Sequence, residues 1–219
     1  MNVFDIVGPV MIGPSSSHTA GAARIGRIAR SLLGERAVRA DILLHGSFAK
    51  TYRGHGTDKA LVAGILGMRP DDPRIRHSLE LAAATDLDVQ IRPVELAGAH
   101  PNTAVIALVG ETGRRVKMQA SSVGGGNVLV TSVDGMAVEI TGQHPTMIVL
   151  HRDVPGLIAA VTDVLSDGGV NICNFRLSRD RRGGTAVMSI EMDSAPGEAL
   201  AQAVSALPNV LRVTKIDSL

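Results

Sequence analysis

Residues 151–172 read HRDVPGLIAAVTDVLSDGGVNI, and they set the architecture of the C-terminal third of the chain. The turn-forming residues Asp153–Gly156 precede an apolar pattern with helical spacing, which predicts a helix that begins near Leu157. Gly168-Gly169 ends that helix. The apolar run Met147–His151 lies just before this stretch and suits a buried strand. These residues therefore predict a strand, a turn and a helix in direct succession.

The residues that follow complete the same unit. Val170–Ser178 and Thr185–Met192 have strand patterns and flank a polar, glycine-containing turn, which predicts a β-hairpin. Pro196 suits the first turn of a second helix, which reaches about Leu207, and Val210–Ile216 has the pattern of a last strand. The order strand–helix–strand–strand–helix–strand predicts a ferredoxin-like βαββαβ domain with one antiparallel sheet and two helices on one face.

The preceding residues predict a separate mixed α/β domain, so we expect domains at 1–143 and 147–219. Ser17 or Thr19 can cap a helix that reaches about Leu33. The other expected elements are strands at 38–44, 88–94, 103–109 and 114–120, a helix at 57–66 capped by Thr57 or Asp58, a helix opened by Asp72-Pro73, and a hairpin turn at Asp134-Gly135. The predicted fold class is α/β (α+β).

Composition narrows the classes of function. The 219-residue chain has 22 Lys and Arg against 21 Asp and Glu, so no strong field draws it to nucleic acid or to an anionic membrane. Aromatic residues make up 2% of the chain, which argues against a base-stacking platform. No run approaches the roughly 20 apolar residues of a membrane-spanning helix, and the N-terminus lacks an export pattern. We expect a cytoplasmic protein that acts on a small molecule or on another protein.

Cys173 is the single cysteine of the chain and can form no internal disulfide. An iron–sulfur cluster normally needs about four thiolates, so this chain cannot hold one by itself. Cys173 lies within a predicted strand, where we expect it to be a core residue. The histidine spacings match no zinc signature, so no metal site is predicted.

Residues 13–21 read GPSSSHTAG and place several hydroxyls and an imidazole at the approach to a helix N-terminus. Exposed backbone N–H groups and the positive end of the helix dipole favour a carboxylate or phosphate at such a place. An elaborate helix cap is the alternative, but capping explains one serine and leaves His18 without a role. The stretch therefore predicts anion binding.

Two further histidines stand in glycine-flanked turns, His45 in LHGS (44–47) and His55 in GHGTD (54–58). Both stretches lie at the ends of predicted elements, where α/β domains collect binding residues. The ordinary pKa of imidazole lies near neutrality, which suits acid–base chemistry. No Gly-x-Ser-x-Gly elbow supports a hydrolase. The run Gly124–Gly126 allows either an anion-binding nest or a flexible loop.

These stretches resemble the iron–sulfur L-serine dehydratases. GPSSSHTAG (13–21) and HGSFAKTYRGHGTD (45–58) are similar to two signature stretches of the β subunit, whose domain is often called the allosteric substrate-binding domain. Residues 147–219 resemble an ACT domain. The resemblance covers nearly the whole chain. It departs at Ala22, where many relatives have Pro, and at Tyr52-Arg53, which concerns fine specificity more than reaction class.

The resemblance implies a β-elimination in amino-acid catabolism, in which L-serine yields pyruvate and ammonia. It implies a 4Fe–4S cluster that acts as a Lewis acid and is carried by a separate, cysteine-rich α subunit, so this chain is not expected to be active alone. His18 or His55 would take part in the proton chemistry. The substrate-binding residues implied by the resemblance are Ser15, Ser16, Ser17, Thr19, His45, Ser47, Thr57 and Asp58.

The ACT resemblance implies effector binding, with L-serine itself as the candidate, and self-association of two copies through a continuous sheet. The expected effector residues are Asp153, Pro155, Gly156 and Asn171, although Asp153 could simply cap the helix. The alternative function is a purely regulatory, ligand-sensing module of the kind attached to D-3-phosphoglycerate dehydrogenase. The SSSHT and GHGTD stretches favour the dehydratase.

Overall fold

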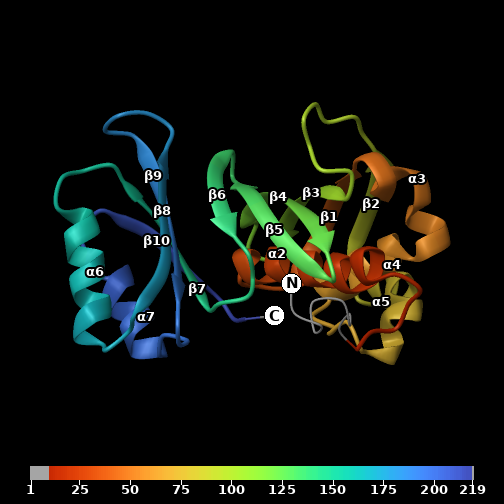
Figure 1. Cartoon of the computed structure of the whole chain (residues 1–219), viewed down its shortest axis with the longest axis horizontal. Helices are drawn as coiled ribbons and strands as arrows, with labels where there is room; N and C mark the ends of the chain where they lie inside the picture. The colour runs from red at the N-terminus through yellow and green to blue at the C-terminus, as the bar shows by residue number, and fades with distance from the viewer. Residues whose placement is uncertain (1–9, 219) are drawn as a thin grey trace. The chain divides into compact units, whose positions relative to one another are not determined.

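The computed structural model describes residues 10–218, which divide into two units at Gly135–Met136 (Figure 1). Each unit contains its own helices and strands. The predicted α/β (α+β) fold class is confirmed. Among the described residues, no helix is long and apolar enough to cross a membrane.

The first unit is built on a mixed sheet with the strand order β2-β1-β3-β4-β5. β1 and β2 pair in parallel, and each of the other neighbouring strands pairs antiparallel. The first four strands in chain order were predicted from the sequence, whereas β5 was not. The predicted hairpin turn at Asp134-Gly135 directly follows β5, and both of its residues have positive φ. The strands are β1 (Ala37–Leu44), β2 (Asp88–Pro93), β3 (Thr103–Gly110), β4 (Arg115–Gly124) and β5 (Asn127–Val133).

The helices of the first unit begin and are capped at other residues than the sequence predicted. A π-helical turn, η1 (Ser16–Gly21), precedes α2 (Ala22–Leu33), and its cap is Ser15 rather than Ser17 or Thr19. α3 (Gly46–His55) was not predicted as a helix at all. α4 (Thr57–Ile65) starts from Gly56 without a side-chain cap, so the expected capping by Thr57 or Asp58 is wrong. Asp72 does open the next segment, η2 (Pro73–His77) followed by α5 (Ser78–Ala84).

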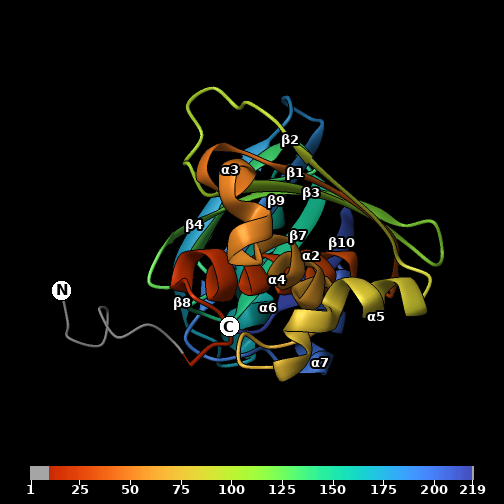
Figure 2. The ribbon, with the colours of Figure 1, turned by 90° about the vertical axis from the view of Figure 1, so that its right-hand side faces the viewer.

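α2 and α4 lie side by side against one face of the sheet and touch through two glycines (Figures 1 and 2). A Cβ atom at Gly64 would lie 2.1 Å from the Ala23 carbonyl oxygen, and one at Gly26 would lie 2.2 Å from that of Leu61. No side chain fits there, so the two backbones are in direct contact. This contact fixes η1, at the start of α2, relative to the start of α4.

The second unit has the predicted ferredoxin-like topology, with the antiparallel strand order β10-β7-β9-β8. Its two helices cover one face of that sheet (Figure 1). Met147, Val161 and Ile190 are among the fully buried residues between the sheet and the helices. β6 (Met136–Ile140) precedes these elements and is not a strand of that sheet. The elements of the ferredoxin-like fold are β7 (Thr146–Arg152), α6 (Leu157–Asp167), β8 (Ile172–Arg179), β9 (Thr185–Met192), α7 (Glu198–Ser205) and β10 (Val210–Ile216).

Cys173 corrects one expectation, because it is exposed rather than in the core. The pairing of β8 with β9 shifts register between Ile172 and Asn174, which leaves Cys173 as the additional residue of a β-bulge. β8 is also an edge strand, so the strand pattern around Cys173 does not imply burial on both faces.

Candidate functional site

The stretch GPSSSHTAG folds into a tight turn that presents His18 to the interior of the first unit. The hydroxyl of Ser15 accepts a hydrogen bond from the His18 backbone N–H at 3.3 Å. A Cβ at Gly13 would lie 2.2 Å from Thr19 Oγ1, and a Cβ at Gly21 would lie 2.1 Å from Ser122 Oγ. Both glycines are therefore required for the close approach that forms this turn.

The imidazole of His18 is held from both sides by serine hydroxyls. Nδ1 lies 3.3 Å from Ser15 Oγ, and Nε2 lies 3.2 Å from Ser47 Oγ at the start of α3. In either neutral tautomer, one serine can donate to the unprotonated nitrogen while the other accepts from the N–H. The ring makes edge-on contacts with Phe48 and His55, with centroid distances of 5.2 and 4.8 Å. This arrangement brings two predicted site histidines and two predicted site serines together.

The environment of His18 favours its neutral form. Burial lowers its pKa below the ordinary value of 6.5, and the nearby His55 lowers it further, while the contact with Ser47 raises it in part. A buried imidazole that is neutral at pH 7 and fixed by two hydroxyls is able to accept a proton.

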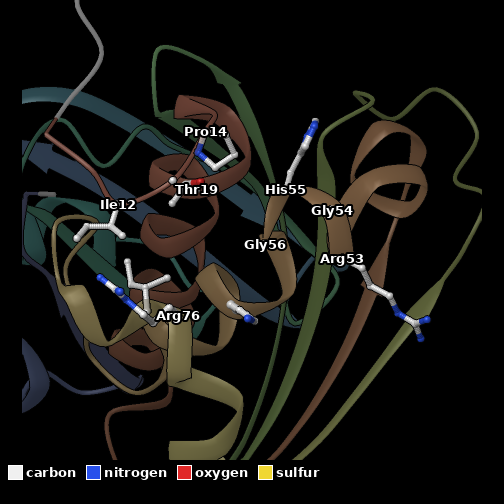
Figure 3. A pocket seen from close by; sticks show the side chains of 11 residues that line it. Ile12, Pro14, Thr19, Arg53, Gly54, His55, Gly56 and Arg76 are labelled. Carbon is white, nitrogen blue, oxygen red and sulfur yellow. The ribbon is translucent and has the colours of Figure 1, made fainter.

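A pocket of about 290 Å³ opens beside this cluster (Figure 3). Figure 3 shows that its walls come from the N-terminal turn, the α3–α4 junction and η2, with the Arg53 side chain directed away from Thr19. Its volume is near the lower end of the range for small-molecule sites. The lining residues are Ile12, Gly13, Pro14, Thr19, Arg53, Gly54, His55, Gly56, Lys59, Ile75 and Arg76.

The charge of this pocket is one-sided. Lys59 and Arg76 contribute cations, whereas the Arg53 side chain extends away, and no acidic side chain is among the lining residues (Figure 3). Thr19 adds a buried hydroxyl that has no hydrogen-bond partner within residues 10–218. A buried hydroxyl without a partner is costly, which makes Thr19 Oγ1 a ready ligand for an anion in the pocket.

Lys59 and Arg76 were not predicted as site residues. Lys59 lies in the first turn of α4, just past the Gly56 break that follows His55, so the sequence alone does not place it beside His55. Arg76 reaches the pocket only because η2 packs against α4, for which the sequence carries no local signal.

The other predicted substrate residues lie around this cluster rather than in it. His45 Nδ1 lies 3.1 Å from the Leu96 backbone nitrogen and 3.4 Å from the Val94 carbonyl oxygen. Asp58 accepts the backbone N–H of Lys59 and lines a second cavity of about 520 Å³ with Tyr52, whose ring lies 5.4 Å from the Arg53 guanidinium carbon. Thr57 is buried at the start of α4, and Ser16 and Ser17 are half-buried within η1.

The run Gly124–Gly126 forms the hairpin between β4 and β5, and all three glycines have positive φ. The Gly126 carbonyl accepts a hydrogen bond from the Arg24 guanidinium at 2.7 Å. This contact ties the hairpin to α2, so the run forms an anchored turn, and its role as an anion-binding nest stays a prediction.

The expected effector residues do not all meet within one chain. Asp153 Oδ2 accepts hydrogen bonds from Gly183 N–H and the Arg179 guanidinium, which lower its pKa, and it does not cap α6. Gly156 is the cap residue, with φ of 84°. The Asn171 amide donates to Asp193 at the opposite end of β9. Since β9 has eight residues, these ends are roughly 23 Å apart.

Comparisons with known proteins agree with this division of the chain. A family model described as serine dehydratase beta chain matches residues 2–132, and an ACT domain model matches residues 146–209. A probable L-serine dehydratase beta chain of Bacillus subtilis is 43% identical over 98% of this chain and 97% of its own length. The L-serine dehydratase beta chain of Peptoniphilus asaccharolyticus is 36% identical over 93% and 92%. A D-3-phosphoglycerate dehydrogenase of Synechocystis is 23% identical, and the match spans 34% of that enzyme.

Proposed function

The chain belongs to the serine dehydratase beta-chain family, and we propose that the pocket lined by Thr19 and His55, beside His18, binds L-serine during deamination to pyruvate and ammonia. It is the beta chain of an L-serine dehydratase, since two relatives of that description match it over nearly their full length. The alternative of a purely regulatory, ligand-sensing module has little support, because the D-3-phosphoglycerate dehydrogenase is only 23% identical and most of its own length lies outside the matched region.

One observation carries the assignment of roles: a neutral imidazole stands between two serine hydroxyls beside a cation-lined pocket. The Thr19 hydroxyl and the cations of Lys59 and Arg76 would bind the substrate carboxylate. His18 would then accept the α-proton, because its lowered pKa keeps it unprotonated. His55 contacts His18 and is exposed, so it would pass that proton to solvent.

The residues of this chain do not fit a 4Fe–4S cluster. Its one thiol, Cys173, lies in the second unit, whereas a cluster takes about four thiolates. We propose that a cysteine-rich alpha chain holds the cluster and that the cluster supplies a Lewis acid for the departing hydroxyl. The residues of this chain bind and orient L-serine and take up the proton. A complex of this kind would work in the reducing cytoplasm.

The test is pyruvate release from L-serine under anaerobic conditions. The chain alone should be inactive, and it should become active when mixed with an alpha chain whose cluster has been reconstituted. His18→Asn should abolish this activity while the mixture still forms a complex. An alpha chain that is equally active with and without this chain would refute the proposal.

We also propose that residues 1–143 are the substrate-binding domain and that residues 147–219 bind an effector, with L-serine as the candidate. Antiparallel pairing of β8 from two copies would bring the start of one strand beside the end of the other. Asn171 of one copy would then approach Arg179 and Asp153 of the second copy. This pairing would unite effector residues that a single chain holds at opposite ends of its sheet.

A further inference from the structure

Three potential metal ligands that are far apart in the sequence lie close together at one end of the second unit. His144 lies in the turn before β7, Cys173 lies on β8, and Asp193 directly follows β9. One ligand atom from each lies within 4.8 Å of the other two. We propose that these three side chains bind a zinc ion.

The backbone pairing explains why the three residues meet. β8 and β9 pair antiparallel with Ile172 opposite Met192, so Cys173, one residue into β8, and Asp193, one residue beyond β9, both lie near that end of the sheet. The Met192 N–H donates to the Pro145 carbonyl at 2.9 Å and brings the turn containing His144 to the same end. Because Cys173 is the additional residue of the β-bulge, its side chain can turn toward this end instead of following the strand alternation.

The carboxylate of Asp193 is already oriented. Its Oδ2 accepts the Asn171 side-chain amide at 2.6 Å, and its backbone N–H donates to the Asn171 carbonyl at 3.1 Å. Metal-binding carboxylates are commonly held in this way by a second hydrogen-bonding residue. One carboxylate oxygen is thereby fixed, and the other is available to a metal.

The donor set suits zinc in charge and in chemistry. A thiolate, a carboxylate and a neutral imidazole carry a net charge of −2, which a divalent cation neutralises, and sulfur with nitrogen and oxygen is a donor set typical of zinc. In a tetrahedral zinc site, ligand atoms are roughly 3.3–3.8 Å apart. Small rotations of the exposed Cys173 and Asp193 side chains would close the present spacing to that range. Three protein ligands leave the fourth position to water.

The surrounding charges favour a cation here. The buried Glu191 carboxylate accepts hydrogen bonds from Thr141 and Asn174 close to the same end of the sheet. The Asp193 carboxylate lies within 4.8 Å of the Cys173 sulfur, and Glu191 accepts the side-chain amide of Asn174, the residue next to Cys173. A bound cation would offset this negative potential and stabilise the thiolate.

Cobalt is a suitable probe, because a thiolate bound to Co²⁺ gives a charge-transfer absorption band. The full-length chain should develop this band until one ion is bound per chain, and Zn²⁺ should then displace it. Cys173→Ser should abolish the band. His144→Gln and Asp193→Asn should each weaken binding by more than about 100-fold, and Asn171→Ala should weaken it by roughly 10-fold to 100-fold.

The matched controls are His77→Gln and Asp163→Asn, which change exposed residues outside the triad and should leave binding unchanged. Far-UV circular dichroism checks the fold of each variant, and the three ligand variants test the site independently. Absence of the band in the wild-type chain would overturn the proposal. So would a band that persists at full affinity in both His144→Gln and Asp193→Asn, because the thiol would then bind cobalt without the other two residues.

Discussion

At the scale of single residues, the pH dependence of the enzyme should report on His18. Its pKa is lowered by burial and by the neighbouring His55, so it remains an unprotonated base down to a pH below 6.5. As the pH falls through this lowered pKa, His18 becomes protonated and can no longer accept the α-proton. The acid limb of kcat/KM for pyruvate release by the complex should therefore lie below pH 6.5.

Replacing His55 with Gln provides a sharper form of this prediction. The change removes a charge that opposes protonation of His18, so the pKa of His18 should rise and the acid limb should move to higher pH. His77→Gln, at an exposed position beside Glu80, should leave the profile in place. An acid limb that does not move in His55→Gln would show that His18 is not the group that titrates.

Thr19 allows binding to be separated from stability. Thr19→Val keeps the shape of the side chain but removes a buried hydroxyl that has no partner within the described residues 10–218. KM for L-serine should rise about 10-fold, the equivalent of one hydrogen bond, while the free energy of unfolding in urea should not decrease. Ser189→Ala removes a comparable hydroxyl from the second unit and should leave KM unchanged. A loss of stability in Thr19→Val without a change in KM would assign Thr19 to packing alone.

At the scale of elements, the contact between α2 and α4 aligns the two halves of the site. Gly64→Ala would place a methyl group 2.1 Å from the Ala23 carbonyl oxygen and force the helices apart. We expect the free energy of unfolding to fall by about 1–3 kcal/mol, and turnover to fall as well because η1 and α4 both contribute to the pocket. Chemical denaturation and pyruvate release measure the two effects.

Gly197→Ala is the matched control for that change. Gly197 has an ordinary φ of −60°, and an added Cβ would have nothing within 4 Å. Its effect should stay within about 1 kcal/mol, since only the cap preference of α7 changes. Equal losses in the two variants would mean that the close helix contact has no special importance.

At the scale of the whole molecule, the exposed edge of β8 should govern self-association. We expect the wild-type chain to sediment as a dimer at micromolar concentration, and Leu177→Lys to sediment as a monomer. Leu177 lies on the edge strand and is partly exposed, so a lysine there would place like charges on two abutting strands. A wild-type chain that remains monomeric with and without L-serine would contradict β8 pairing.

The elements from β7 to β10 could be predicted because local signals such as Gly168-Gly169 separate them, although α7 begins at Glu198, two residues after Pro196. α3 was not predicted from the sequence because it is short and polar, and the glycines at its two ends are typical of loops. The bulge at Cys173 depends on how two strands align, which the apolar pattern of one strand does not encode. The hydroxyl and imidazole residues near His18 stand together in the sequence, whereas Arg76 reaches the pocket only through tertiary packing.

Tyr52 gives the molecule a built-in optical reporter. It is the single tyrosine of a chain without tryptophan, so its phenol dominates the intrinsic ultraviolet emission. The Arg53 guanidinium stands over its ring, and the helix that carries both residues also supplies His55 to the pocket. Rearrangement of that helix around serine would alter the brightness of this one fluorophore, and binding could then be followed in real time without a label.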